Sequence, residues 1–131
     1  MRAFLIGLSL LSLAACGSSG TGPDGQAAIG GAFVLTSADG KALPAAFADS
    51  TLKSGTLTVT DSGWTQLTIV QYAVGGNPAG DTLTQGGSWV TSGSNLTLYD
   101  YSNTTAYTGT FTPTSITLTT KTATVLGYSK Q

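Results

Sequence analysis

The chain has 131 residues, of which only 8% are charged, and its formal net charge is −1. It contains no histidine and no glutamate, and only one cysteine, so neither a Ser-His-Asp or Cys-His arrangement nor a common zinc or iron site can be assembled. No cluster of lysine and arginine is present of the kind that binds nucleic acid. We therefore expect no enzyme activity, no cofactor, no metal site and no nucleic-acid partner.

The first sixteen residues have the pattern of a bacterial lipoprotein signal. Arg2 precedes an apolar run over 3–13, which is shorter than the about 20 residues needed to cross a bilayer but typical of an export signal. The segment Leu13-Ala14-Ala15-Cys16 resembles the lipobox in all four positions. This resemblance implies cleavage before Cys16, diacylglycerol on its sulfur and acylation of the new amine. An ordinary secretory signal is the alternative.

Three segments follow from this interpretation. Residues 1–15 are the signal peptide, 16–28 are the lipidated cysteine with a tether rich in Gly, Ser and Thr, and 29–131 form one folded domain. The lipid on Cys16 makes the membrane a partner. Gly17 resembles the sorting signal of outer-membrane lipoproteins, so we expect an envelope protein anchored in the outer membrane and facing the periplasm. The sequence specifies no protein partner.

The rest of the chain consists of short alternating runs separated by turn residues, which predicts an all-β domain. The eight predicted strands are 31–37, 52–60, 64–74, 81–91, 95–102, 106–112, 115–122 and 124–130. The one predicted departure is a short turn of helix at 43–49, where proline is followed by alanines.

Turn residues predict several local features. Asp61-Ser62-Gly63 indicates a tight turn, and Asn77-Pro78 marks the main loop. Gly86-Gly87 predicts a bulge or a sharp bend. The strand at 64–74 has apolar residues on both faces, which predicts that it is strongly twisted or bulged.

Eight strands in consecutive order favour a small up-and-down antiparallel β-barrel, because closure removes the free edges of the sheet. A two-sheet β-sandwich is the alternative. The expected outward faces carry rows of threonine instead of a lipid-facing apolar band, which argues against a membrane-spanning barrel.

The two ends of the domain resemble a known group. A spaced motif opens the domain with Gly31, Phe33, Leu35, Ser37, Asp39, Gly40, Leu43 and Pro44. It resembles the first strand of small bacterial lipocalin-like lipoproteins, and 124–130 resembles their terminal strand, which has an aromatic residue and a basic end. The resemblance implies a calycin-like β-barrel. It implies little about function, because that group largely lacks assigned activities.

Aromatic side chains are the candidate ligand-binding groups, since an eight-stranded barrel can hold one small ligand or be filled by its own side chains. We expect Phe33, Trp64, Trp89 and Phe111 to serve mainly as core residues. The predicted ligand-binding set is Trp89, Tyr99, Tyr101 and Tyr107. Asp100 lies between two of these tyrosines and is expected to bind nearby backbone amides at the strand end, with anchoring of a ligand as the alternative.

Two functions remain open at this stage. The first is a tethered barrel that binds a small apolar or amphipathic ligand. The second is a structural or interaction lipoprotein with a filled barrel and no ligand. A continuous cavity above about 300 Å³ favours the first, and a closed core favours the second.

Overall fold

The computed structural model describes residues 29–131, so the predicted signal peptide, Cys16 and the predicted tether lie outside the described residues. Residues 29–131 fold into β-structure, and among them no helix could span a membrane. The strands are β1 (Gly31–Ala38), β2 (Lys41–Ala42), β3 (Ala45–Ala46), β4 (Ser50–Thr60), β5 (Gly63–Tyr72), β6 (Asp81–Ser92), β7 (Asn95–Asp100), β8 (Thr105–Phe111), β9 (Ser115–Thr119) and β10 (Val125–Lys130).

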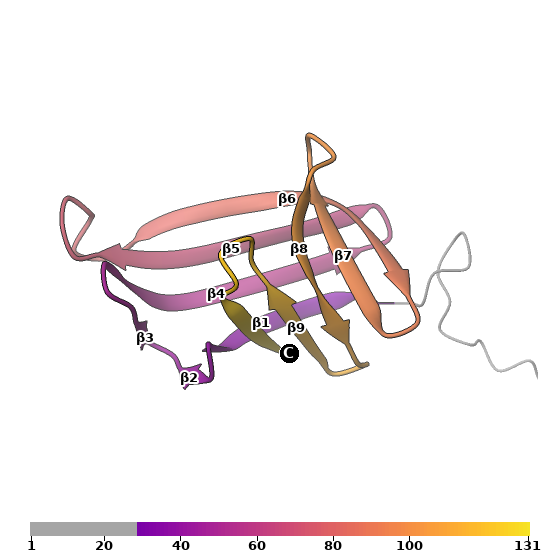
Figure 1. Ribbon diagram of the computed structural model, residues 1–131, viewed down its shortest axis with the longest axis horizontal. Coiled ribbons are helices and arrows are strands. Elements are labelled where there is room, and N and C mark those ends of the chain that lie inside the picture. Colours follow the sequence, from indigo (N-terminus) through magenta and orange to yellow (C-terminus); the bar gives the residue numbers. More distant parts are fainter. Residues whose placement is uncertain (1–28) are drawn as a thin grey trace, which may run out of the picture.

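The eight long strands close into an antiparallel barrel (Figure 1). Strands β4 to β10 pair in chain order, and β1 completes the circle by pairing with both β10 and β4. The all-β, up-and-down barrel of eight strands is therefore confirmed over the predicted sandwich alternative. The two short strands are additions, because β2 pairs with the end of β1 and β3 pairs with the start of β4.

Alternation of apolar and hydroxyl residues explains why these segments form the wall. In β4, Leu57 and Val59 are buried while the threonines beside them are exposed, and Ile116 and Leu118 in β9 repeat the pattern. Because side chains alternate between faces with a period of two, one face fills the barrel and the other meets solvent. Threonine suits the outer face because its β-branched side chain favours extended backbone.

The predicted helical turn at 43–49 is wrong. The backbone of Ala45 and Ala46 pairs with Leu52 and Thr51, which makes this segment the edge strand β3. Ala45 is only 1% exposed and belongs to the hydrophobic core. Tertiary pairing has overridden the weak local preference of alanine for helix.

The bulge alternative is wrong for both of the strands in which it was considered, β5 and β6. Pairing of β5 with β6 and of β6 with β7 is continuous through Gly86 and Gly87, so there is no bulge at these glycines. β5 is also regular, and the register shift beside it comes from an extra residue in β4 between Leu52 and Ser54. The glycines instead permit close approach, because a Cβ on Gly87 would lie 1.9 Å from the Tyr99 carbonyl oxygen.

The loop between β5 and β6 has the predicted turn. The Gly80 amide donates to the Asn77 carbonyl at 2.8 Å, and the Ala79 amide donates to the Asn77 side-chain oxygen at 3.0 Å. An asparagine side chain that accepts a hydrogen bond from the amide two residues later is a common way to fix such a turn. This loop joins β5 to β6.

The barrel is much longer on one side than on the other. Strand β6 pairs with β5 over Asp81 to Gly87 and with β7 only from Gly87 to Ser92. Figure 1 shows the β4–β5–β6 sheet continuing past the turns that join β7 to β8 and β9 to β10. The mouth at this end is therefore bounded by a long sheet on one side and by short turns on the other.

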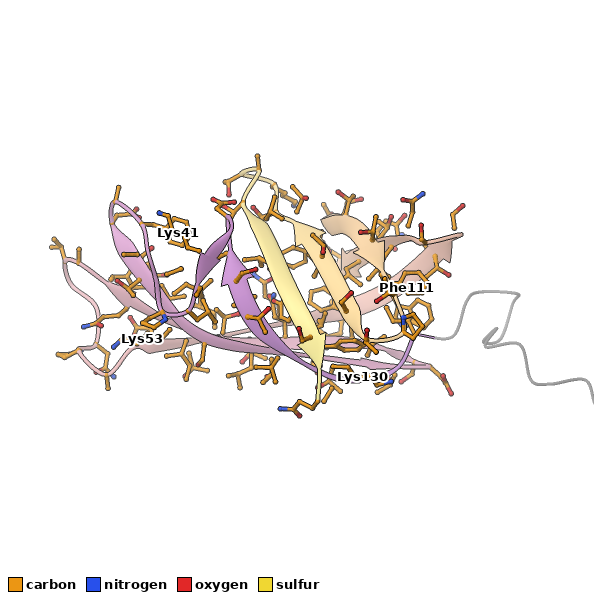
Figure 2. All side chains as sticks on the ribbon, turned by 90° about the horizontal axis from the view of Figure 1, so that it is seen from below. Lys41, Lys53, Phe111 and Lys130 are labelled. Carbon is orange, nitrogen blue, oxygen red and sulfur yellow. The ribbon has the colours of Figure 1, made fainter. Side chains whose placement is uncertain are left out.

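Side chains fill the interior of the barrel. The core contains Phe33, Leu57, Trp64, Leu98, Ile116, Leu118 and Tyr128 among its most buried members. The charged residues lie at the periphery, with Lys41 and Lys53 toward one end and Lys130 toward the other, the end at which Phe111 also lies (Figure 2). At that second end the Lys130 ammonium lies 5.9 Å from the centre of the Phe33 ring.

Candidate functional site

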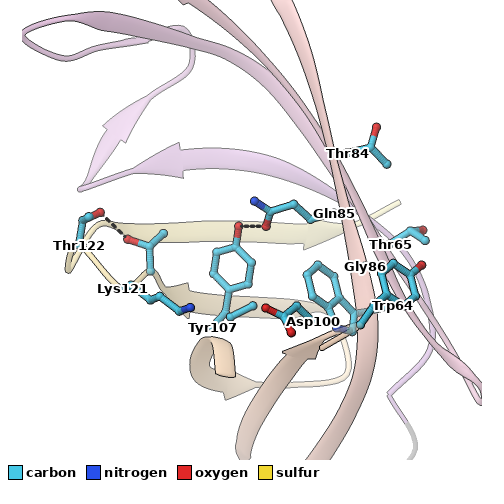
Figure 3. Close-up of a pocket in the computed structure, with 12 residues that line it drawn as sticks. Trp64, Thr65, Thr84, Gln85, Gly86, Asp100, Tyr107, Lys121 and Thr122 are labelled. Atoms are coloured by element: carbon cyan, nitrogen blue, oxygen red, sulfur yellow. Dashed lines mark hydrogen bonds between the residues drawn. The ribbon is translucent and has the colours of Figure 1, made fainter. Parts of the chain in front are cut away.

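A cleft of about 540 Å³ opens at the asymmetric mouth of the barrel (Figure 3). Its walls come from three elements: β6 at Thr84 to Gly86, the β7–β8 turn with the first residues of β8, and the β9–β10 turn. Trp64 of β5 contributes to its floor. The cleft exists because the β7–β8 and β9–β10 turns end before the long sheet does.

The floor of the cleft is aromatic. The rings of Trp64 and Tyr107 meet edge to face, with centroids 5.8 Å apart and an interplanar angle of 83°. The Trp64 indole N–H donates to the Tyr99 carbonyl at 2.9 Å, which fixes the orientation of its ring. Edge-to-face pairs add about 0.5–1.5 kcal/mol beyond the burial of their surface. The floor is therefore rigid and pre-formed.

A chain of hydrogen bonds runs from this floor into the core. The Tyr107 hydroxyl lies 2.8 Å from the side-chain oxygen of Gln66 and 2.7 Å from that of Gln85. The Gln66 amide nitrogen in turn contacts the Tyr128 hydroxyl. Gln66 is 4% exposed, whereas Gln85 reaches the solvent side of the cleft. The chain thus connects a buried phenol with the cleft surface.

The Gln66 side chain joins the two phenols through both ends of its amide. Its nitrogen donates to the Tyr128 hydroxyl, and its oxygen lies within reach of the Tyr107 hydroxyl. A hydroxyl has one proton, so Tyr107 donates to the oxygen of Gln66 or to that of Gln85 at any one time. Among the described residues no buried side-chain nitrogen or oxygen lacks a hydrogen-bond partner.

Alkaline conditions are expected to weaken the fold through the two phenols in this chain. Burial raises the pKa of Tyr128 and of Tyr107, although the hydrogen bond with Gln66 opposes the rise in both cases. Above the usual tyrosine pKa of about 10, the unfolded chain releases protons that the folded chain retains. The free energy of unfolding should therefore fall as pH rises above about 10, by at most about 1.4 kcal/mol per pH unit for each tyrosine.

Thermal unfolding of the full chain between pH 8 and 11 tests this expectation. Tyr128→Phe removes one of the two groups, so its melting temperature should decline less steeply than that of the wild type. Equal declines in the two proteins would show that Tyr128 does not couple folding to pH.

Asp100 stabilises the β7–β8 turn at the edge of the cleft. Its Oδ1 accepts hydrogen bonds from the Ser102 hydroxyl at 2.6 Å, the Thr104 amide at 2.9 Å and the Ser102 amide at 3.0 Å. The Ser102 hydroxyl and the Thr104 amide are the main reasons that the pKa of Asp100 is lowered, and Lys121 contributes a smaller effect. The expected role of Asp100 in binding nearby backbone amides is therefore present. The same residue also lines the cleft, together with Lys121.

The structure brings only two of the four predicted ligand-binding residues into the cleft. Tyr101 and Tyr107 line it, and Tyr101 is 82% exposed. Trp89 is buried in the core, where its indole N–H donates to the Thr60 carbonyl at 2.8 Å. Tyr99 pairs with Ser88 on the opposite face of β7 from the buried Leu98, and it does not line the cleft.

Gln85 and Lys121 in the cleft, and Gln66 buried beneath it, were not among the predicted residues. Gln66 and Gln85 are directly paired across β5 and β6, and both face the inside of the barrel at the mouth. The sequence could have indicated Gln66, because it lies two residues after Trp64 in β5. Side chains two residues apart lie on the same face of a strand, so a core position for Trp64 places the polar Gln66 on the inward face as well. No such pattern indicates Lys121, because it lies in a turn, where side chains do not alternate between two faces.

No family model, no curated protein and no solved structure matched the chain in comparisons with known proteins. Residues 29–131 contain no group of three His, Cys, Asp or Glu side chains that could hold a metal ion. The cleft and its polar chain are thus the features on which a function can be argued.

Proposed function

We propose that the protein is a lipid-anchored binding module of the bacterial envelope, whose lipocalin-like barrel holds a small amphipathic ligand in the cleft at its mouth. The observation that carries this proposal is the cleft itself, because 540 Å³ falls within the range of pockets that bind drug-sized molecules. The anchor is the lipid expected on Cys16, and its support is the lipobox alone.

The lining of the cleft suits a ligand with both apolar and polar surface. Trp64 and Tyr107 offer apolar ring surface, while Gln85, Asp100 and Lys121 offer an amide and two opposite charges. A few polar groups in fixed positions beside an apolar surface are typical of specific small-molecule sites.

The filled interior limits the size of the ligand. The Gln66 side chain and the Tyr128 ring occupy the space beneath the cleft and hydrogen-bond across it. A long acyl chain would need a tunnel along the barrel axis, and these side chains stand where it would run. The proposed ligand is therefore a compact amphipathic molecule instead of an extended apolar one.

The alternative function is a structural or interaction lipoprotein that binds no ligand. The packed core favours it, because a filled barrel can serve as a rigid spacer above the membrane. The two functions differ in one measurable respect, which is whether a small molecule accompanies the protein.

Native mass spectrometry of the full chain, extracted in mild detergent from the envelope in which it was made, tests the proposal. We expect a wild-type mass that lacks residues 1–15, carries lipid on Cys16 and shows an additional non-covalent small molecule. A protein mass without lipid would contradict the anchor, and a clean apo mass at all detergent concentrations would contradict the ligand.

Two tyrosines that lie two residues apart provide a matched pair of variants. Tyr101→Ala removes an exposed side chain from the cleft and should reduce the retained small molecule, whereas Tyr99→Ala removes a tyrosine that does not line it and should leave retention unchanged. Equal effects of the two variants would show that the small molecule is not bound in the cleft.

A further inference from the structure

Strand β6 leaves one of its edges without a partner for half of its length. From Asp81 to Gly86 it pairs with β5 on one side, and β7 joins its other side only at Gly87. Figure 1 shows β6 as the outermost strand of the long sheet in this region. The opposite edge of that sheet is covered, because β3 pairs with β4 through Ala45 and Ala46. Among β4, β5 and β6, it is therefore β6 that has a continuous open edge in this part of the sheet.

Hairpin geometry identifies the backbone groups that point outward from this edge. Two-residue turns join Thr60 to Gly63 and Ser92 to Asn95, and the pair that closes such a turn is hydrogen-bonded. Successive residues of a strand direct their N–H and C=O groups to opposite sides. Starting from either turn, this alternation means that the odd-numbered residues of β6 bond with β5 over 81–87, while the even-numbered residues direct these groups away from β5. Thr82 and Thr84 thus present two donors and two acceptors that no other strand within residues 29–131 takes up.

The edge lacks the devices with which proteins usually prevent strand addition. Residues 81–86 contain no lysine, no proline and no bulge, and their one charge is Asp81 at the far end. Leu83 is 41% exposed in the middle of the segment. Open, regular and nearly uncharged edges pair readily with another strand.

We propose that this edge binds the same edge of a second copy of the chain, so that the two β6 strands pair antiparallel about a two-fold axis at Leu83. In this register Thr82 lies opposite Thr84 of the other copy, and Asp81 lies opposite Gln85. No like charges meet, and the two exposed leucine side chains contact each other. Such an interface is self-complementary, as a two-fold dimer requires.

The neighbouring residues favour this register over a shift toward β7. A Cβ on Gly86 would lie 2.7 Å from the Tyr101 hydroxyl, so Tyr101 packs against the face of β6 at Gly86, where a strand shifted toward β7 would have to fit beside it. Centring the pair on Leu83 keeps Gly86 out of the interface. The added strand also lies beside Thr84 and Gln85, which line the cleft, so the second copy provides the barrel wall that is missing at the mouth.

The dimer should be weak and dependent on concentration. Five paired residues bury far less than the about 800 Å² per partner of a standard interface. A covalent trap is therefore a better test than size alone. Leu83 is in a non-hydrogen-bonded position of the proposed pair, where the Cα atoms come within about 4.5 Å, a distance that a disulfide can span.

Oxidative cross-linking of the full chain, with detergent micelles in excess over protein, tests the proposal. Leu83→Cys should form a disulfide-linked dimer. Two controls should not: the wild type, whose only cysteine is Cys16, and Thr84→Cys, whose Cα atoms would be more than about 7 Å apart across the two-fold axis. Cross-linking of Thr84→Cys at the level of Leu83→Cys would overturn the proposed register and the proposal.

Two further changes in the Leu83→Cys background separate edge pairing from random collision. Thr84→Pro removes an outward N–H without touching the β5 pairing, and it should abolish the cross-link. Thr82→Lys with Thr84→Lys places two lysines directly opposite each other across the interface and should have the same effect even if the proline variant is unstable. Undiminished cross-linking in the lysine variant would overturn the proposal, and the open edge would then remain for a strand of another protein.

Discussion

Gly109→Ala is expected to destabilise the barrel by at least about 3 kcal/mol, in the range seen when a substitution forces a clash inside a packed structure. A Cβ on Gly109 would lie 1.8 Å from the Thr117 carbonyl oxygen and 2.8 Å from the carbonyl carbon. Both atoms belong to the backbone of the neighbouring strand β9, so no side-chain rotation can relieve the contact. Strands β8 and β9 would have to separate.

Urea unfolding of the full chain, followed by tryptophan fluorescence, measures this effect. Gly30→Ala is the matched control, because its Cβ would meet only the Val59 carbonyl oxygen at an ordinary 3.8 Å. We expect the control to unfold within about 1 kcal/mol of the wild type. A Gly109→Ala variant as stable as this control would show that β8 and β9 can move apart at little cost.

Gln66→Leu is expected to cost about 2–3 kcal/mol, because it leaves buried phenolic hydroxyls without a hydrogen-bond partner. Gln66 lies between Tyr107 and Tyr128, and within residues 29–131 it is the hydrogen-bond partner of the Tyr128 hydroxyl. Tyr107 keeps its bond with Gln85, so the loss falls mainly on Tyr128. Tyr128→Phe alone should cost less, since Gln66 can still bond with Tyr107.

A double-mutant cycle on Gln66 and Tyr128 shows whether the two side chains act together. Once Gln66 is leucine, removing the Tyr128 hydroxyl should be nearly neutral or stabilising, which gives a coupling free energy of about 1–2 kcal/mol. Gln66→Leu combined with Ser88→Ala, a change on the outer face of β6, should be additive. Additivity in both pairs would mean that the hydrogen bond between Gln66 and Tyr128 does not stabilise the fold.

The strands and the barrel could be predicted because their signals are local. Alternation in segments such as Leu57 to Val59 and Ile116 to Leu118 sets the inward face of each strand, and short turns force consecutive strands to be neighbours. The segment 43–49 could not be assigned in this way. Its alanines favour helix weakly, and the β4 backbone that makes it a strand lies outside the segment.

The cleft could be predicted only in part, because it depends on how far each strand continues past its neighbour. The stagger between β6 and β7 is a property of barrel closure and leaves no mark in either strand. Alternation does place Tyr99 on the outer face, since the buried Leu98 precedes it. The aromatic character of Trp89 does not distinguish a core position from a ligand site, and the structure puts it in the core.

The way in which β1 closes the barrel has a consequence for how the chain folds. Most strands pair with the strand that follows them, but β1 must pair with β10, which joins Phe33 to Lys130. The Gln131 amide also donates to the Ala32 carbonyl at 3.0 Å. Each hairpin from β4–β5 to β9–β10 can form from segments that are neighbours in the chain, whereas the ring stays open until β10 reaches β1. Closure brings together the most distant parts of the sequence and should set the rate of folding.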